Sequence, residues 1–394
     1  MFLGTGAVYK ATWYGQGKPA SMHIDDLLRI AMDHKASDLH LKVGNYPHLR
    51  VDGELVPLTE QPRVSAEDML NMAFSMMSNR QKQKFKEQAE LDMAYGVAGL
   101  GRFRVNVFQQ RGNVGLVLRV IPTKIRPLDE LHMPSIVERI CDEQRGLVLV
   151  TGITGSGKST TLAAMIDRIN SSRPEHIITI EDPIEFLHRD KKGFVNQREV
   201  EVDTPSFASA LRASLRQDPD TILVGEMRDV ETISTALHAA ETGHMVFSTL
   251  HTLDAVETVN RIISVFPPSE QKQIRLQVAA TLRAVISQRL VKRVDSVGRV
   301  PAVEVLIATP YIRECIITPE KTRYIKEAIA AGTSQYGMQT FDQSLYDLYA
   351  QGLVTYETAV ETASNPDDFR LRVQGIASTA DAAREEMEQA SFGR

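Results

Sequence analysis

The sequence predicts an α/β protein with two folded domains, and three observations support this expectation. A chain of 394 residues is long enough for two or three domains of ~100–200 residues each. The first third combines helical stripes with strands of alternating polarity. After it, short apolar runs alternate with amphipathic helical segments, a pattern typical of a mostly parallel sheet with helices on both faces.

The composition is that of an ordinary globular protein, with 43% hydrophobic and 24% charged residues. The formal net charge of −5 provides no general basic surface, so we expect no nucleic-acid partner. The two cysteines, Cys141 and Cys315, exclude a disulfide scaffold and a four-cysteine zinc module, and they suit a reducing cytoplasm. No apolar run approaches the ~18 residues of a membrane span, so we expect no direct membrane insertion.

Changes in composition mark the expected domain boundaries. Residues 1–21 combine glycines with the single tryptophan and show no periodicity, so we expect an irregular leader or tag. A mixed α/β domain should occupy residues 22–125, followed by a proline-containing linker at 126–135. The second domain should occupy residues 136–375. Residues 376–394 are polar with alternating charge, and we expect them to form a tail.

The first domain should contain both helices and strands. Residues 24–31 carry a helical apolar stripe, and a methionine-rich helix is expected over 69–77. The dipeptide Asp52-Gly53 between apolar runs is a hairpin signal. Residues 101–108 alternate in polarity, as a strand with one buried face does, and residues 115–121 predict a second strand.

One loop of the second domain fits the pattern G-x-x-x-x-G-K-[ST] of a phosphate-binding loop, between an apolar strand-like run at 147–150 and a predicted helix. Its glycines let backbone N–H groups close around phosphate oxygens at the helix N-terminus. Its lysine places a charge on the β- and γ-phosphates, and its serine can ligate Mg²⁺. The pattern therefore predicts a nucleoside triphosphate site. The residues concerned are Gly152, Thr154, Gly155, Ser156, Gly157, Lys158, Ser159 and Thr160.

Such a site also needs one carboxylate near the metal ion and another that orients water. Glu226 follows the strand-like run Thr221–Val224, where the metal-side acid is expected, although Gly225 replaces the usual aspartate. Strand ends of a parallel sheet meet at one edge, so we expect Glu226 near Mg²⁺ and Glu185 near the attacking water. Glu181 and Asp182 precede Glu185, and solvated loop carboxylates are the alternative interpretation for both.

Arginines can stabilise charge on a transferred phosphoryl group, often from a neighbouring subunit. Arg212 and Arg228 flank the strand before Glu226, while Arg104 and Arg119 lie on the polar faces of first-domain strands. By spacing alone, each of these arginines is better explained as a solvated strand or helix residue.

Two histidines, His244 and His251, bracket a predicted strand at 245–248. Their odd offset of seven residues points them to opposite faces of an extended segment, which disfavours a shared metal ion. Either could touch the γ-phosphate end of the site, and an ordinary core or surface histidine is the alternative. Beyond residue 254 we expect mostly helices, including a long one from Ser269, with a β pair around 301–306.

Ordered segments of the second domain together resemble the secretion ATPase superfamily, and among its members the motors that retract type IV pili. The resemblance covers about residues 22–375, although a helical motif of the retraction branch is only partly matched at 311–318. The matching segments are I-T-G-S-G-K-S-T-T at 153–161, I-E-D-P-I-E at 180–185, L-R-Q-D-P-D at 215–220, G-E-M-R-D at 225–229 and G-H-M-V-F-S-T-L-H-T at 243–252.

This resemblance implies a PAS-like N-terminal domain and a RecA-like P-loop ATPase domain with a C-terminal helical extension. It implies a homohexamer that binds ATP and Mg²⁺ between the two domains of each subunit. Glu185 would be the catalytic glutamate and Glu226 the Walker B glutamate. The arginines that would contact the nucleotide are Arg104, Arg119, Arg212 and Arg228.

The function implied by the resemblance is pilus retraction at the cytoplasmic face of the inner membrane. The expected partners are an inner-membrane platform protein and a paralogous retraction ATPase. A pilus assembly or type II secretion ATPase is the first alternative, but these usually have a long extra N-terminal region, and many have a four-cysteine module. A non-hydrolysing regulatory subunit is disfavoured by the intact Lys158, Ser159, Glu185 and Glu226, and a DNA translocase by the acidic charge.

Overall fold

The structure is a computed structural model that describes residues 22–51, 53–122, 124–295 and 298–376. The expected leader at 1–21, Asp52 of the hairpin signal and the tail beyond residue 376 lie outside the described residues. The chain divides into two compact units, of which one ends at Ile121 and the other begins at Pro122. None of the helices within the described ranges is long and apolar enough to cross a membrane.

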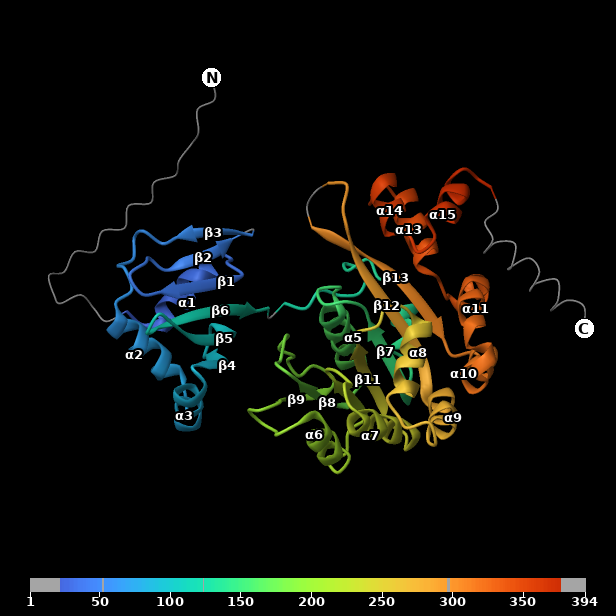
Figure 1. Ribbon diagram of the computed structural model, residues 1–394, viewed down its shortest axis with the longest axis horizontal. Helices are drawn as coiled ribbons and strands as arrows, with labels where there is room; N and C mark the ends of the chain where they lie inside the picture. The colour runs from blue at the N-terminus through green and yellow to red at the C-terminus, as the bar shows by residue number, and fades with distance from the viewer. Residues whose placement is uncertain (1–21, 52, 123, 296–297, 377–394) are drawn as a thin grey trace, which may run out of the picture. The chain divides into compact units, whose positions relative to one another are not determined.

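The first unit is built on a six-stranded antiparallel sheet in the order β3-β2-β1-β6-β5-β4 (Figure 1). The predicted alternation is confirmed, because Phe103, Val105 and Val107 of β5 are fully buried. They share one core with Met69 and Met72. The elements are α1 (Ile24–Asp33), β1 (Asp38–Lys42), β2 (His48–Val51), β3 (Glu54–Pro57), α2 (Ala66–Met76), α3 (Asn79–Gln88), β4 (Glu90–Val97), β5 (Gly101–Gln110) and β6 (Asn113–Ile121).

Two elements of this unit, α3 and β4, are absent from the sequence prediction. Helix α3 has almost no apolar stripe, since Phe85 is its one buried residue, and it begins with a capping box between Ser78 and Gln81. Strand β4 buries only Leu91 and Met93 and pairs along its whole length with β5. Both elements depend on tertiary pairing more than on hydrophobic periodicity, and the pattern of apolar residues therefore does not predict them.

The second unit is built on a seven-stranded sheet in the order β13-β12-β7-β11-β10-β8-β9, in which only β13 is antiparallel to its neighbour. This arrangement confirms the predicted mostly parallel sheet. The strands are β7 (Gly146–Thr151), β8 (His176–Glu181), β9 (Phe194–Glu199), β10 (Thr221–Val224), β11 (Met245–Leu250), β12 (Leu282–Lys292) and β13 (Arg299–Ile307).

Helices cover both faces of this sheet, as the apolar runs predict (Figure 1). On β7, Leu147 and Leu149 face the core shared with α7, α8 and α9, whereas Val148 and Val150 face α4 and α5. The helices are α4 (Ile136–Ile140), α5 (Lys158–Ser172), α6 (Phe207–Ser214), α7 (Val230–Glu241), α8 (Ala255–Ser264) and α9 (Gln271–Thr281).

The structure corrects the expectation of a long helix from Ser269. Helix α9 ends at Thr281, and the chain continues as β12, which pairs in parallel with β7. The segment after Thr281 is apolar enough for either structure, and the partnership with β7 decides it. The C-terminal helices are α10 (Pro310–Ile317), α11 (Ile325–Ala331), α12 (Thr333–Tyr336), α13 (Phe341–Ala350), α14 (Tyr356–Thr362) and α15 (Pro366–Val373), with the 3₁₀ helix η1 (Pro319–Tyr324) between α10 and α11.

Candidate nucleotide site

The phosphate loop connects β7 to α5 at the carboxyl edge of the parallel sheet, the edge at which open α/β sheets bind ligands. Gly157 caps α5 in the left-handed conformation with φ of 95°, which suits glycine. Gly152 has φ of 141°, and a Cβ there would lie 2.5 Å from the Gln288 carbonyl oxygen. Glycine is therefore required at Gly152 for packing as well as for backbone conformation.

Lys158 lies within this loop rather than in solvent, with 9% of its surface exposed. Its Nζ donates to the carbonyl oxygens of Gly152 at 2.8 Å and Ile153 at 3.0 Å. Burial lowers the pKa of Lys158, while the nearby carboxylates of Glu226 and Glu185 act in the opposite direction. The sheet thus brings both predicted carboxylates into the electrostatic environment of the loop lysine.

The hydrogen-bond donors of the loop are suited to a phosphate ligand. The hydroxyl of Ser156 is buried and has no hydrogen-bond partner among the described residues. Ser159 and Thr160 lie in the first turn of α5, where free backbone N–H groups and the helix dipole favour an anion. Thr154 and Gly155 form the exposed tip of the loop. These residues fit the phosphates of a nucleotide.

Glu226 follows β10 and Gly225, and its carboxylate has two basic neighbours. Arg228 donates to Glu226 at 2.7 Å, and Nε2 of His251 lies 3.4 Å from the other carboxylate oxygen. Burial raises the pKa of Glu226, but the hydrogen bond from Arg228 and the charge of His251 outweigh it, so its pKa lies below the usual value. Two predicted site residues, Arg228 and His251, therefore meet at this acid.

Glu185 lies in the loop after β8, and its side chain is exposed. Its backbone N–H points toward the carboxylate of Glu181, with an N···O distance of 3.4 Å. Burial raises the pKa of Glu181, although Thr179 and Gln197 donate hydrogen bonds to its carboxylate. Glu181 is therefore an internal loop anchor and not the solvated carboxylate that was the alternative interpretation.

The other predicted arginines lie in different places. Arg212, at the end of α6, forms an ion pair with Glu231 in the first turn of α7. Arg104 and Arg119 belong to the first unit, where they lie directly opposite each other on β5 and β6. Asp38 is buried and accepts a hydrogen bond from Arg119 at 2.8 Å.

His244 lies away from Lys158 and Glu226. It precedes β11, at the amino end of that strand, and its Nδ1 is 3.0 Å from the carbonyl oxygen of Ala239. His251 follows the carboxyl end of the same strand. The two histidines therefore lie at opposite ends of β11, so the structure places only His251 near the predicted carboxylates.

A cavity of about 370 Å³ borders the phosphate loop and was not predicted. Gln288 of β12 lines it and donates to Thr161 of α5 at 2.8 Å, although the two residues are far apart in the sequence. No local pattern signals such a pairing. The other lining residues are Arg126, Glu130, Leu131, His132, Met133, Ser156, Gly157, Thr160, Leu290, Arg293, Gly298, Arg299 and Pro301.

A protein-only metal centre is not present in the part of the chain that the structure describes, where no three histidine, cysteine or carboxylate residues cluster suitably. Magnesium in nucleotide sites is held largely by phosphate oxygens and water, with one or two protein oxygens. The Ser159 hydroxyl at the start of α5 and the Glu226 carboxylate are oxygen ligands of the type that Mg²⁺ prefers.

Comparisons with known proteins show the family of this chain. Residues 16–367 match a protein family described as type II/IV secretion system protein. The chain is 48% identical over 352 residues to the type IV pilus retractation ATPase PilT of Pseudomonas aeruginosa, covering 88% of this chain and 100% of that relative. It is 49% identical over 323 residues to a twitching motility protein of Neisseria gonorrhoeae, covering 82% of this chain and 86% of that protein.

A solved structure shows the same arrangement of elements. The crystal structure of the pilus retraction motor PilT with bound ADP has a TM-score of 0.82 and 47% sequence identity to this chain. The match covers 88% of this chain and 98% of that one. The likeness therefore includes both units and extends beyond the phosphate loop.

Proposed function

The chain belongs to the type II/IV secretion system protein family, and within that family we propose that it is an ATP-hydrolysing motor for type IV pilus retraction. The observation that carries the proposal is the phosphate loop at the carboxyl edge of a parallel sheet, where the carboxylates of Glu226 and Glu185 both act electrostatically on Lys158. Two relatives named for pilus retraction and twitching motility support the direction of force.

In the proposed mechanism, the phosphate loop and Lys158 bind the β- and γ-phosphates. The Ser159 hydroxyl and the Glu226 carboxylate would hold Mg²⁺, which would supply charge neutralisation on the phosphate oxygens. Glu185 is exposed and can reach a water molecule, which it orients and polarises for attack. Arg228 and His251 hold Glu226 ionised by lowering its pKa.

The remaining predicted residues belong to the wider assembly. We propose that the chain forms a homohexamer, in which Arg104, Arg119 and Arg212 contact the nucleotide of their own or a neighbouring subunit. The PAS-like domain is proposed over residues 22–125, the linker over 126–135 and the ATPase domain over 136–375. The ring would act at the cytoplasmic face of the inner membrane on a pilus platform protein, with a paralogous ATPase as a further partner.

The deciding experiment is the amount of surface pilin in cells that lack this gene. A retraction motor predicts more assembled pilin than in the parent strain. The excess should disappear when the intact gene is restored, but not when the Glu185→Gln variant is supplied. Cells without pili would instead identify an assembly motor. Purified chain without ATPase activity would favour a regulatory subunit.

A further inference from the structure

Two side chains of the neighbouring strand β9 hold the loop that carries Glu185: Glu199 accepts from the Ile184 N–H at 3.2 Å, and Gln197 makes three further hydrogen bonds. We propose that Gln197 is a positioning residue that fixes the backbone around Glu185 and so places its carboxylate for the attacking water. This inference rests on the proposed ATPase function, and it adds a residue that no motif of the sequence indicates.

The first hydrogen bond of Gln197 acts on the segment before Glu185. Its Nε2 donates to Oε1 of Glu181 at 3.1 Å, and that oxygen also accepts from the Thr179 hydroxyl at 2.6 Å. The second oxygen of Glu181 faces the backbone N–H of Glu185. Gln197 therefore orients the carboxylate to which Glu185 is tied.

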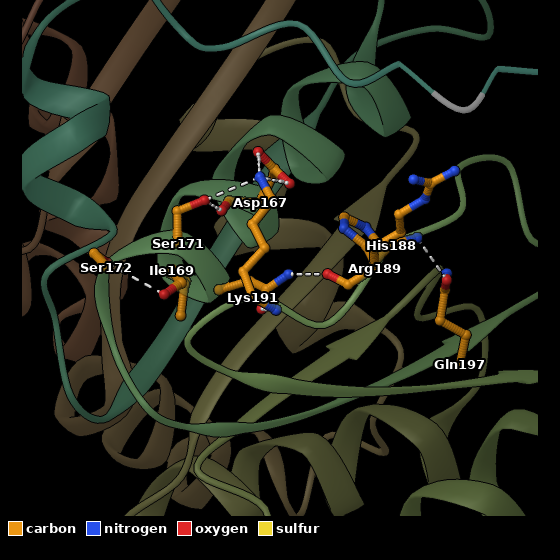
Figure 2. A network of polar contacts seen from close by, with 9 residues as sticks. Asp167, Ile169, Ser171, Ser172, His188, Arg189, Lys191 and Gln197 are labelled. Carbon is orange, nitrogen blue, oxygen red and sulfur yellow. Dashed lines mark hydrogen bonds and ion pairs between the residues drawn. The ribbon is translucent and has the colours of Figure 1, made fainter.

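Two further hydrogen bonds act on the segment after Glu185. Nε2 of Gln197 donates to the carbonyl oxygen of Phe186 at 2.9 Å. Its Oε1 accepts from the backbone N–H of His188 at 2.8 Å, a contact that Figure 2 shows. One amide thus bonds to the chain on both sides of Glu185, and its partners fix which end of the amide carries nitrogen.

The far end of the same loop has separate anchors on α5, the helix that begins at Lys158. Asn170 is fully buried and donates to the Arg189 carbonyl oxygen at 2.7 Å. Lys191 bonds to Asp167 at 2.7 Å and to the Ser171 hydroxyl at 3.0 Å, as Figure 2 shows. Loss of Gln197 should therefore loosen the part of the loop next to Glu185 and leave the α5 anchors in place.

Glutamine is suited to this position by its chemistry. Its amide nitrogen supplies a hydrogen for each of two acceptors, and its oxygen accepts the third hydrogen bond. A glutamate would place a second carboxylate against Glu181, and a methionine would keep the volume while removing all three hydrogen bonds. These two substitutions separate the electrostatic contribution from the packing contribution.

The test measures steady-state ATP hydrolysis and the affinity for a fluorescent ATP analogue with the purified full chain. We expect Gln197→Met to lower kcat by roughly ten- to a hundredfold, because small misplacements of catalytic groups have effects of this size. KM and nucleotide affinity should change less than about twofold, since Lys158 and its loop are not touched. Amide hydrogen exchange should accelerate over residues 185–188, but not at Ile184, whose N–H Glu199 still accepts, and not over 189–193.

The matched control is Asn196→Ala, one residue away on β9, where the side chain contacts His176 instead of the loop. It should retain the parental kcat. A rescue is also available: Gln197→Glu should lose activity, and adding Glu181→Gln should recover part of it by restoring the 181–197 hydrogen bond with reversed direction. Such recovery is not expected of a residue that merely packs.

Several outcomes would overturn the inference. Parental kcat in Gln197→Met would do so, as would a kcat loss matched by equal losses of nucleotide affinity and melting temperature. If Gln197→Met does not fold, the absence of recovery in the Gln197→Glu, Glu181→Gln pair overturns it. Absence of hydrolysis in both the parent and Asn196→Ala would overturn the proposed function, and this inference with it, whereas an active parent with an active Gln197→Met overturns the inference alone.

Discussion

Arg228 donates a hydrogen bond to Glu226 at 2.7 Å, although both side chains come from one short segment after β10. The acid is mostly buried, with 17% of its side chain exposed, whereas 66% of the arginine side chain is exposed. Because only the arginine is free to move in solvent, the same guanidinium can neutralise Glu226 or turn toward a phosphate. The contact therefore links the ionisation of the acid to the position of the arginine.

This contact predicts a pH-dependent loss of stability in Arg228→Gln. The pKa of Glu226 is lowered in the folded chain, so its ionised form contributes stability above the unfolded pKa of about 4.3. That contribution is lost as the pH falls through the folded pKa. Urea unfolding should show that the free energy of unfolding of the variant is lower than that of the parent by at most about 1 kcal/mol at pH 7, and that this difference shrinks as the pH falls through the folded pKa of Glu226. An equal deficit at both pH values would contradict the prediction, and Glu226→Gln provides the control.

Lys158→Ala should weaken nucleotide binding by at least about tenfold, because the phosphates lose their one charged partner within the loop. Binding of a fluorescent ATP analogue to the purified chain measures the effect. The control is Lys192→Ala, since Lys192 is exposed and its Nζ contacts the Ser172 carbonyl oxygen at the opposite end of α5. Equal affinities in the two variants would show that the loop does not bind the phosphates.

Glu185→Gln should bind ATP normally and hydrolyse it about 10²- to 10⁴-fold more slowly, the usual contribution of a general base. The substitution keeps the backbone N–H that faces Glu181, so the loop should remain in place. Phosphate release and nucleotide affinity measured on one preparation separate the two effects. Normal turnover would transfer the water-orienting role to another group, and Asp182→Asn serves as the neighbouring carboxylate control.

Glu304 predicts a second pH effect, of opposite sign. It is a buried residue of β13 that accepts from the N–H of Ala255, the first residue of α8, at 2.8 Å, and burial raises its pKa to about 7. A raised carboxyl pKa gives stability that is complete below the unfolded pKa of about 4.3 and declines as the pH rises to about 7. Glu304→Gln keeps the acceptor and should flatten this decline between pH 5 and 7 in thermal unfolding. An unchanged slope would exclude Glu304 as its source.

The regions predicted well are those in which local pattern and tertiary environment agree. The phosphate loop and the alternation around Phe103 each follow from residues close in sequence. Strand β12 was not predicted, because its partner β7 lies more than a hundred residues earlier. The role of Gln197 could not be predicted for a similar reason, because its side chain reaches the loop after β8 only when β9 pairs with β8.

The candidate site shows the same division. Glu226 and Lys158 could be predicted because strand ends of a parallel sheet share an edge. His244 and His251 could not be separated by spacing, because only the direction of β11 decides which of them reaches that edge. In the sequence, Glu181 looks like the other acidic residues of its segment. Its role as an anchor depends on its burial and on the hydrogen bonds from Thr179 and Gln197.

The central place of β7 also has a consequence for synthesis of the chain. Its two neighbours, β11 and β12, lie about 95 and about 130 residues downstream. At translation rates of about 5–20 residues per second, roughly 7–25 seconds pass between the synthesis of β7, which precedes the phosphate loop, and the synthesis of the second of its two partner strands. During that time the nascent chain presents an apolar strand with unpaired edges, the kind of segment that aggregates and that chaperones protect. We therefore expect the ribosome-bound chain to be prone to aggregation at β7, the strand that precedes the phosphate loop.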